Sequence, residues 1–454
     1  MRVLFTPFPA STHVHTQVPL AWAMRAAGHE VRVATQPDVV EDINNAGLTA
    51  VAVGEVLDVP ATMNPEYTDE PEEMRDEAWL DVLDISETRP EKLTHSYVHG
   101  VLTAWTSFVY QNTLPDTTTE ELIDFARAWR PDLVVWDTMY YPGALAARIS
   151  GAAHARLMFG LDLVGLMRRH YLGGLAALPP ALREDPLEEW MSRILRRHGR
   201  EFSEDLVVGQ WTIDPVPPSL RLPVDLPSVP MRYVPYNGEA TIPGWLRERP
   251  RRPRVCLTLG RSFREVVGAD RASVGDLLAA VADLDVEVVA TFTADQLDPD
   301  RRVPGNVRVV DFVPLDALLA TSAAIVHHGG SGTLQTALAH GVPQVMVPAK
   351  MWCNVPKAHR VRDAGAGLCI DPEDLTPDGL RTALVRVLGE PAFATNADRL
   401  RREVAGTPAP ADIVPVLERL TAEHRALQGA AAPHTLVTRA AGQAPHTGCA
   451  RRAP

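Results

Sequence analysis

The sequence has few cysteines, no long apolar run and fewer basic than acidic residues. Its 454 residues include four cysteines and no Cys-x-x-Cys pair, which argues against a disulfide framework or a zinc site and favours a reducing cytoplasm. No apolar stretch approaches the roughly 18 residues that span a bilayer, and Pro7 soon interrupts the first one, so we expect neither a membrane span nor a signal peptide. The net charge of −13 disfavours nucleic acid as a partner.

The residue pattern alternates strand-like and helix-like segments in both halves of the chain. Residues 1–6 predict a strand, a loop runs to Val18, 19–27 predict a helix and 30–35 a second strand. The further predicted strands are 133–136, 255–259, 287–292, 307–310, 324–327 and 344–347, and a helix starts at 142–147. The alternation predicts an α/β protein with two doubly wound parallel sheets.

Composition divides the chain into four parts. Prolines concentrate between Trp211 and Pro253 and indicate a connection, so we expect a first domain over 1–213, a linker over 214–253 and a second domain over 254–428. The last helices of the second domain can pack back on the first domain. Residues 429–454 lack periodicity and are expected to be a disordered tail. The acidic segment 68–77 is either a solvated loop or a docking element for a partner protein.

The segment 324–333, Ala-Ile-Val-His-His-Gly-Gly-Ser-Gly-Thr, is a strand followed by a glycine-rich turn and a helix start. Free backbone N–H groups and the positive end of the helix dipole suit a diphosphate, although glycines also make ordinary turns. The segment lacks the Gly-Lys-Ser/Thr ending of a Walker loop. The residues expected to contact the anion are His328, Gly330, Ser331, Gly332 and Thr333.

Several short motifs together carry a family resemblance. They are Val-Pro-Leu-Ala-Trp-Ala (18–23), Ala-Gly-His-Glu-Val (27–31), Cys-Leu-Thr-Leu-Gly (256–260), Phe-Val-Pro (312–314) and His-His-Gly-Gly (327–330). With them, the chain to about residue 425 resembles the family-1 glycosyltransferases of the GT-B fold, in which two Rossmann-like domains face each other across a cleft. It looks closest to the branch that transfers deoxyaminosugars, such as desosamine, mycaminose and forosamine, from thymidine diphosphate to macrolides and other polyketides.

The resemblance implies a donor site in the second domain. His328 and the 330–333 turn would hold the diphosphate, and the backbone of Val313 would pair with the nucleobase. Arg261 and Ser262 follow Leu-Gly, where many relatives have a small hydroxyl residue. One of these two side chains is expected to face the donor phosphates. The alternative for Arg261 is a solvated cation of the loop. Cys353 and Asn354 occupy the sugar-binding loop, where Cys353 replaces an Asp unless the alignment slips by one residue.

The same resemblance implies a catalytic pair in the first domain. His13 stands where the family has the base that deprotonates the acceptor hydroxyl. His15 is the alternative candidate for this base, and we expect it to line the loop instead. Asp137 follows a buried strand and would hold the other nitrogen of the base, with a helix cap for the segment from Pro142 as the alternative. Candidate acceptor-lining residues, each otherwise part of the core, are Trp105, Phe108, Tyr140 and Phe159.

These features predict an inverting, metal-independent glycosyltransferase with no cofactor besides its sugar nucleotide. Two Asp-x-Asp strings, 283–285 and 298–300, are not interpreted as metal sites, because the phosphate turn can itself stabilise a leaving diphosphate. The expected partners are a thymidine diphosphate sugar, a hydrophobic acceptor, and possible accessory-activator and homodimer contacts. The alternatives are a nucleotide-sugar epimerase of the same fold and a non-catalytic paralogue that serves as a binding subunit.

Overall fold

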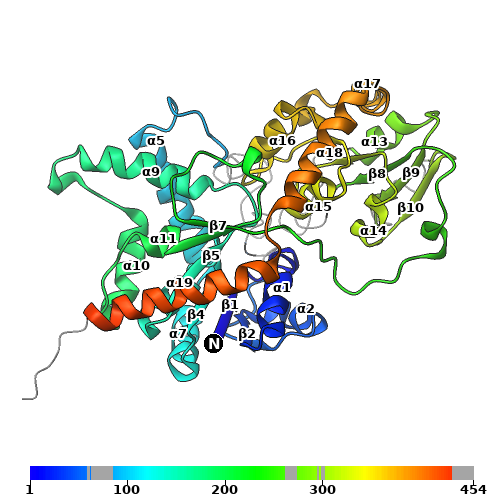
Figure 1. Ribbon diagram of the computed structural model, residues 1–454. Helices are drawn as coiled ribbons and strands as arrows, with labels where there is room; N and C mark the ends of the chain where they lie inside the picture. The colour runs from blue at the N-terminus through cyan, green and yellow to red at the C-terminus, as the bar shows by residue number, and fades with distance from the viewer. Residues whose placement is uncertain (59–61, 63–84, 261–272, 294–295, 298–301, 432–454) are drawn as a thin grey trace, which may run out of the picture.

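The structure is a computed structural model that describes residues 1–58, 62, 85–260, 273–293, 296–297 and 302–431 (Figure 1). It contains two parallel sheets, each in its own domain, which confirms the predicted α/β fold. The predicted strands agree with the observed ones to within one residue at each end. Agreement is close because parallel strands covered on both faces are nearly continuous apolar runs.

In the described residues, the first sheet has seven parallel strands in the order β3-β2-β1-β4-β5-β6-β7. Their bounds are β1 (Arg2–Thr6), β2 (Glu30–Thr35), β3 (Ala50–Ala52), β4 (Leu133–Asp137), β5 (Ala153–Leu157), β6 (Trp211–Asp214) and β7 (Ser228–Pro230). All five residues of β4 and of β5 are buried, so the centre of this sheet is covered on both faces.

The helices of the first domain are α1 (Ser11–Ala26), α2 (Val40–Asn45), α5 (His95–Ala104), the π-helix η4 (Trp105–Tyr110), α6 (Gln111–Thr113), α7 (Asp116–Trp129), α8 (Pro142–Ser150), α9 (Leu163–Ala176), α10 (Pro186–Arg197) and α11 (Asp205–Val208). Short 3₁₀ turns are η1 (Pro37–Val39), η5 (Pro180–Leu182) and η6 (Pro218–Leu220).

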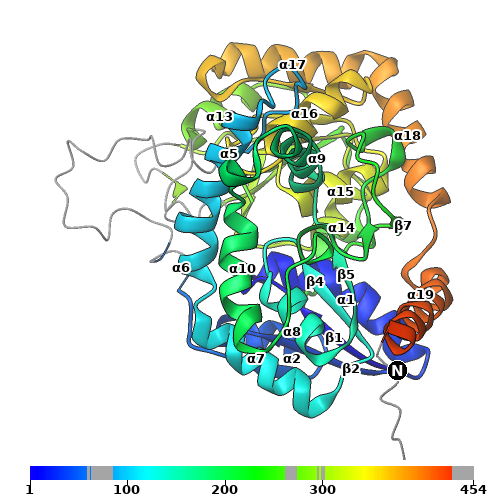
Figure 2. The ribbon, with the colours of Figure 1, turned by 90° about the vertical axis from the view of Figure 1, so that its left-hand side faces the viewer.

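The second sheet has the order β10-β9-β8-β11-β12-β13 in the part of the chain that is described. Its strands are β8 (Arg254–Thr258), β9 (Glu287–Thr291), β10 (Val307–Val310), β11 (Ala324–His327), β12 (Gln344–Met346) and β13 (Gly367–Cys369). Its helices are α13 (Val274–Val281), α14 (Leu315–Leu319), α15 (Ser331–His340), α16 (Asn354–Asp363), α17 (Pro377–Gly389) and α18 (Pro391–Gly406), with 3₁₀ turns η7 (Gly244–Arg247) and η9 (Pro372–Asp374). Figure 2 shows these helices above strands β1, β2, β4 and β5 of the first sheet.

The first helix begins eight residues before its predicted start. We predicted a loop to Val18 and a helix from Pro19, whereas α1 begins at Ser11 and contains Pro19 in its interior. The prediction used proline as a helix-start signal, because proline has no N–H to donate within a helix. Burial of Val14 and Ala21 on the same helix outweighs this cost, and it places both His13 and His15 on α1.

The predicted linker and tail also contain regular structure. Strand β7 lies within 214–253 and pairs with β6, so that part of the linker extends the first sheet. Helix α19 (Pro410–Ala431) follows α18 and returns to the first domain, where it packs on α1 (Figure 1). The helix therefore includes the first three residues of the predicted tail, and 432–454 lie outside the described residues.

Other predictions also fall outside the described residues, namely those for the acidic segment 68–77, for Arg261 and Ser262, and for the Asp-x-Asp string 298–300. In the part of the chain that is described, no helix is both long and apolar enough to cross a bilayer.

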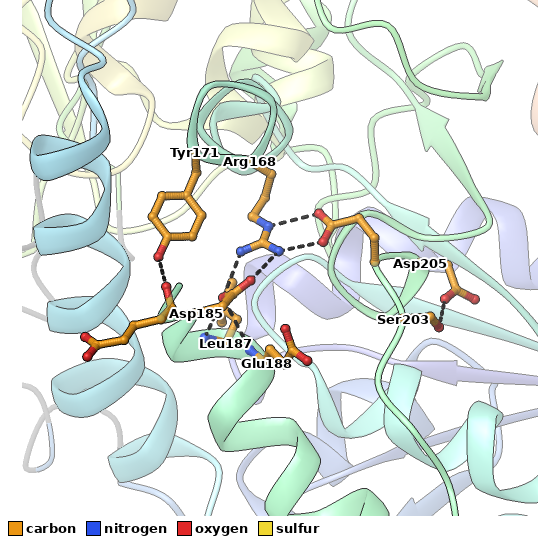
Figure 3. Close-up of polar contacts among 9 residues, drawn as sticks. Arg168, Tyr171, Asp185, Leu187, Glu188, Ser203 and Asp205 are labelled. Atoms are coloured by element: carbon orange, nitrogen blue, oxygen red, sulfur yellow. Dashed lines mark hydrogen bonds and ion pairs between the residues drawn. The ribbon is translucent and has the colours of Figure 1, made fainter. Parts of the chain in front are cut away.

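A buried ionic cluster stabilises the long helical segment that connects β5 to β6 (Figure 3). Arg168 on α9 is 1% exposed and donates two hydrogen bonds to Asp185, at 2.9 and 2.8 Å, and two to Glu204, at 2.9 and 2.5 Å. Asp185 also accepts from the backbone N–H of Leu187 and caps α10. The cluster therefore ties α9 to the start of α10 and to the segment before α11.

Replacing Asp185 by Ala is expected to lower the free energy of unfolding by about 3 kcal/mol, because the substitution removes a helix cap and one of the two carboxylates that pair with a buried guanidinium. Urea denaturation followed by circular dichroism measures the effect. Glu390→Gln, which removes a surface partner of Arg386, is the matched control and should leave the midpoint nearly unchanged. A similar midpoint for both variants would contradict the structural role of the cluster.

Candidate active site between the two domains

The catalytic pair predicted from the sequence is formed at the carboxyl end of the first sheet. His13 lies in the first turn of α1, directly after β1, and Asp137 is the last residue of the neighbouring strand β4. The Nδ1 atom of His13 lies 2.8 Å from Oδ2 of Asp137. A carboxylate only accepts, so Nδ1 carries the proton and Nε2 retains its lone pair.

Asp137 is almost completely buried, and both of its oxygens have partners. Oδ1 accepts from the backbone N–H of Met139 at 2.9 Å, which leaves Oδ2 to hold His13. The residue before α8 is Tyr141, and no side chain caps that helix. The alternative interpretation of Asp137 as the cap of this helix is therefore wrong, because its carboxylate is used in the turn directly after β4 and in the contact with His13.

Aromatic rings surround His13, whereas His15 faces a different part of the molecule. The imidazole of His13 contacts the rings of Phe159 and Phe8, with centroids 4.7 and 5.4 Å away. Two residues further on, the helical rotation of about 200° turns His15 away, and it packs on Tyr236 at 5.1 Å. The structure thus separates the two histidines that the sequence left as rivals.

The glycine-rich turn joins β11 to α15, as predicted. Helix α15 begins at Ser331 after Gly330, and no side chain caps it. In the described residues no backbone carbonyl accepts from the N–H groups of Ser331, Gly332 or Thr333. These groups and the helix dipole therefore remain available for an anion.

The two adjacent histidines of the turn have different roles. His327 uses both nitrogens internally, since Nδ1 accepts from the N–H of Gly329 at 3.1 Å and Nε2 donates to Oε1 of Gln344 at 2.8 Å. Burial, with the nearby charges of His327 and Lys357, lowers the pKa of His328 to about 3. Gly260 makes room for this ring, because an added methyl group would overlap Cε1 of His328.

The predicted sugar loop between β12 and α16 lies against the phosphate turn. Cys353 is fully buried at the start of α16, and Asn354 is 5% exposed beside it. The Nζ atom of Lys357, one helical turn further, donates to Oγ of Ser331 at 2.6 Å. Sequence reasoning missed Lys357, although its spacing of four from Cys353 places both on one face of a helix.

The four acceptor candidates do not lie together. Phe159 contacts His13 and also Trp352, whose ring lies 5.5 Å away, and Trp105 also packs on Trp352, at 5.0 Å. Tyr140 is a fully buried core residue, and Phe108 is 67% exposed. The exposed position of Phe108 follows from the π-helix η4, which the residue pattern did not indicate.

A small hollow lies between the domains next to these residues. Phe159, Leu161 and Leu220 line it from the first half of the chain, and Ser331, Leu334 and Lys357 from the second. None of its lining residues is an Asp or a Glu. Val313, predicted to meet the nucleobase, lies before α14, and no described residue forms a hydrogen bond with its backbone.

Comparisons with known proteins assign the chain to a family. Residues 22–260 match the family "Erythromycin biosynthesis protein CIII-like, N-terminal domain", and 275–420 match its C-terminal counterpart. Aclacinomycin-T 2-deoxy-L-fucose transferase of Streptomyces galilaeus is 54% identical, over 95% of this chain and 98% of the relative. 10-Deoxymethynolide desosaminyltransferase of Streptomyces venezuelae is 48% identical, over 94% and 98%.

Solved structures agree with this assignment. The glycosyltransferase VinC, in complex with dTDP, superposes with a TM-score of 0.83 at 42% identity and covers 93% of this chain and 100% of its own. The spinosyn forosaminyltransferase SpnP gives 0.77 at 43% identity, over 93% and 99%. These relatives are transferases, so neither the epimerase nor the non-catalytic alternative is supported. The chain is a GT-B glycosyltransferase and belongs to the erythromycin biosynthesis protein CIII-like family.

Proposed function

We propose that the protein transfers a deoxyhexose from a thymidine diphosphate sugar to a hydroxyl group of a polyketide aglycone, with inversion at the anomeric carbon. The observation that carries the proposal is the hydrogen bond of 2.8 Å between His13 and Asp137, opposite an uncapped helix start from the other domain. A base for the acceptor and an anion site for the leaving group are the two requirements of this reaction.

In the proposed reaction, Nε2 of His13 takes the proton of the acceptor hydroxyl while the oxygen attacks C1 of the sugar. The bond between C1 and the diphosphate oxygen breaks, and both electrons leave with thymidine diphosphate. Asp137 stabilises the imidazolium that forms, through the hydrogen bond to Nδ1. The N–H groups of Ser331, Gly332 and Thr333 and the imidazole of His328 hold the charge of the leaving group without a metal ion.

The nature of the sugar follows from the loop at Cys353. Its thiol is fully buried, and a methyl group placed on Gly160 would lie only 2.5 Å from Sγ. A buried thiol hydrogen-bonds sugar hydroxyls poorly, so a sugar with few hydroxyls loses least there. Relatives named as transferring 2-deoxy-L-fucose and desosamine support a deoxygenated donor, with or without an amino group.

The acceptor in this proposal is hydrophobic, because the interdomain hollow is lined mainly by apolar side chains. Polyketide-derived acceptors in the names of relatives, such as 10-deoxymethynolide and aklavinone, support the same class. A cytoplasmic location, a homodimer and an accessory activator protein remain predictions.

Replacing His13 by Ala should lower kcat about 10²- to 10⁴-fold, because the acceptor then loses its general base. The affinity for thymidine diphosphate should remain close to the wild-type value, since His13 belongs to the other domain. Product formation by liquid chromatography and calorimetric titration measure the two quantities. His15→Ala is the matched control on the same helix, and a larger kcat loss for it than for His13→Ala would overturn the assignment.

Replacing His328 by Ala should weaken the binding of thymidine diphosphate by about 1 to 3 kcal/mol, the range for a hydrogen bond to a charged group. Because the pKa of His328 is lowered to about 3, the ring is neutral and this loss should be constant from pH 6 to 8. Calorimetry at both pH values measures it. An unchanged Kd would show that His328 does not face the phosphates.

The protein should prefer a deoxygenated hexose over a fully hydroxylated one on the same nucleotide. The comparison is kcat/KM for thymidine diphosphate glucose, a 2-deoxyfucose donor and a desosamine donor, with one polyketide aglycone throughout. Cys353→Asp, which restores a carboxylate to the loop, should move the preference towards the hydroxylated sugar. A clear wild-type preference for glucose would contradict the proposed donor class.

A further inference from the structure

Lys357 differs from the other deeply buried cations of the described chain. Arg156, Arg168 and Arg254 are at most 2% exposed, and each forms an ion pair with a carboxylate, from Asp162, Asp185 and Glu287 respectively. Lys357 is 5% exposed, and within the described residues no carboxylate oxygen lies in ion-pair distance of its Nζ atom. Its Nζ atom donates to the hydroxyl of Ser331 at 2.6 Å and also interacts with the side chain of Cys353.

This arrangement is unfavourable unless an anion completes it. A buried ammonium group that pairs with no carboxylate costs several kcal/mol, which the side chains of one serine and one cysteine do not offset. Burial accordingly lowers the pKa of Lys357, while the neighbouring Cys353 opposes the shift. None of the described residues that line the hollow beside Lys357 is an Asp or a Glu.

The position of the Lys357 ammonium group indicates which kind of anion binds beside it. Its partner Ser331 is the first residue of α15, where three backbone N–H groups lack backbone acceptors in the described structure. His328, on the same turn, is also within range of the positive charge, which contributes to its lowered pKa. The ammonium group therefore meets the uncapped helix start at Ser331, and His328 precedes that helix on the same turn.

We propose that the ammonium group of Lys357 is the counter-ion of the donor's diphosphate and stabilises it as the bond to the sugar breaks. The inference rests on the proposed function, because it requires a nucleotide diphosphate at α15. When the C1–O bond breaks, the diphosphate gains one negative charge, and Lys357 lies where that charge develops. Lys357 thereby supplies, from α16, part of the positive charge that a metal ion supplies in metal-dependent transferases.

The test compares Lys357→Met, which keeps the length of the side chain, with Lys357→Arg and with Lys350→Met as a control. Lys350 lies on the preceding loop and pairs with Glu373 at 3.0 Å, so its replacement removes an equal charge from the surface. Calorimetry with thymidine diphosphate, competition with thymidine, thermal unfolding without ligand and kcat are measured for each protein.

For Lys357→Met we expect the Kd of thymidine diphosphate to rise at least 30-fold and kcat to fall at least tenfold, with thymidine binding unchanged. Without ligand, its Tm should equal or exceed that of the wild type, because an uncompensated buried charge has been removed. Lys357→Arg should keep most of the affinity, and Lys350→Met should resemble the wild type.

Two results would overturn the inference alone. The first is a Kd for thymidine diphosphate in Lys357→Met that lies within threefold of the wild-type value. The second is a lower Tm without ligand together with an equal loss of affinity for thymidine and for thymidine diphosphate. The second result would indicate that Lys357 has a structural role. Failure of the proposed function is distinguishable, because wild-type protein would then neither bind thymidine diphosphate nor transfer a sugar from it.

Discussion

The close approach of the two domains at Gly160 is the contact on which the site depends. Gly160 follows β5 in the first domain, and a Cβ atom there would lie 2.5 Å from Sγ of Cys353 and 3.3 Å from Oγ of Ser331 in the second. Phe159, the preceding residue, contacts both His13 and Trp352. One short loop therefore contacts His13, the loop at Cys353 and the turn at Ser331, and a larger side chain at 160 would separate them.

The interface around this loop is a continuation of the protein core. The largest apolar cluster joins first-domain residues such as Trp105 and Leu161 to second-domain residues such as Leu334 and Trp352. Apolar contact is not directional, so this cluster holds the domains together without fixing their register by itself. The ionic pair of Arg168 with Asp185 lies within the first domain, where it joins α9 to the start of α10 (Figure 3).

The sequence predicted the parts of the fold and site that depend on local pattern. Asp137 and the turn at 328–333 were found because each follows a buried parallel strand, and the carboxyl ends of such strands form sites. The start of α1 was missed because tertiary burial outweighs the local preference of Pro19. Lys357 was missed for a related reason: its significance comes from Ser331 on another helix and from the lack of a nearby carboxylate, neither of which is a property of its own segment.

The path of α19 has a consequence for how the chain folds during synthesis. Ile413, Val414 and Leu417 of this helix belong to the same apolar cluster as Val3, Phe5 and Val14 at the start of the chain. Domains generally fold as the ribosome releases them, the N-terminal one first. Here the first domain cannot complete its core until the second domain has been translated. Until α19 has been translated, the nascent first domain therefore exposes the apolar surface of α1 and β5 that this helix covers.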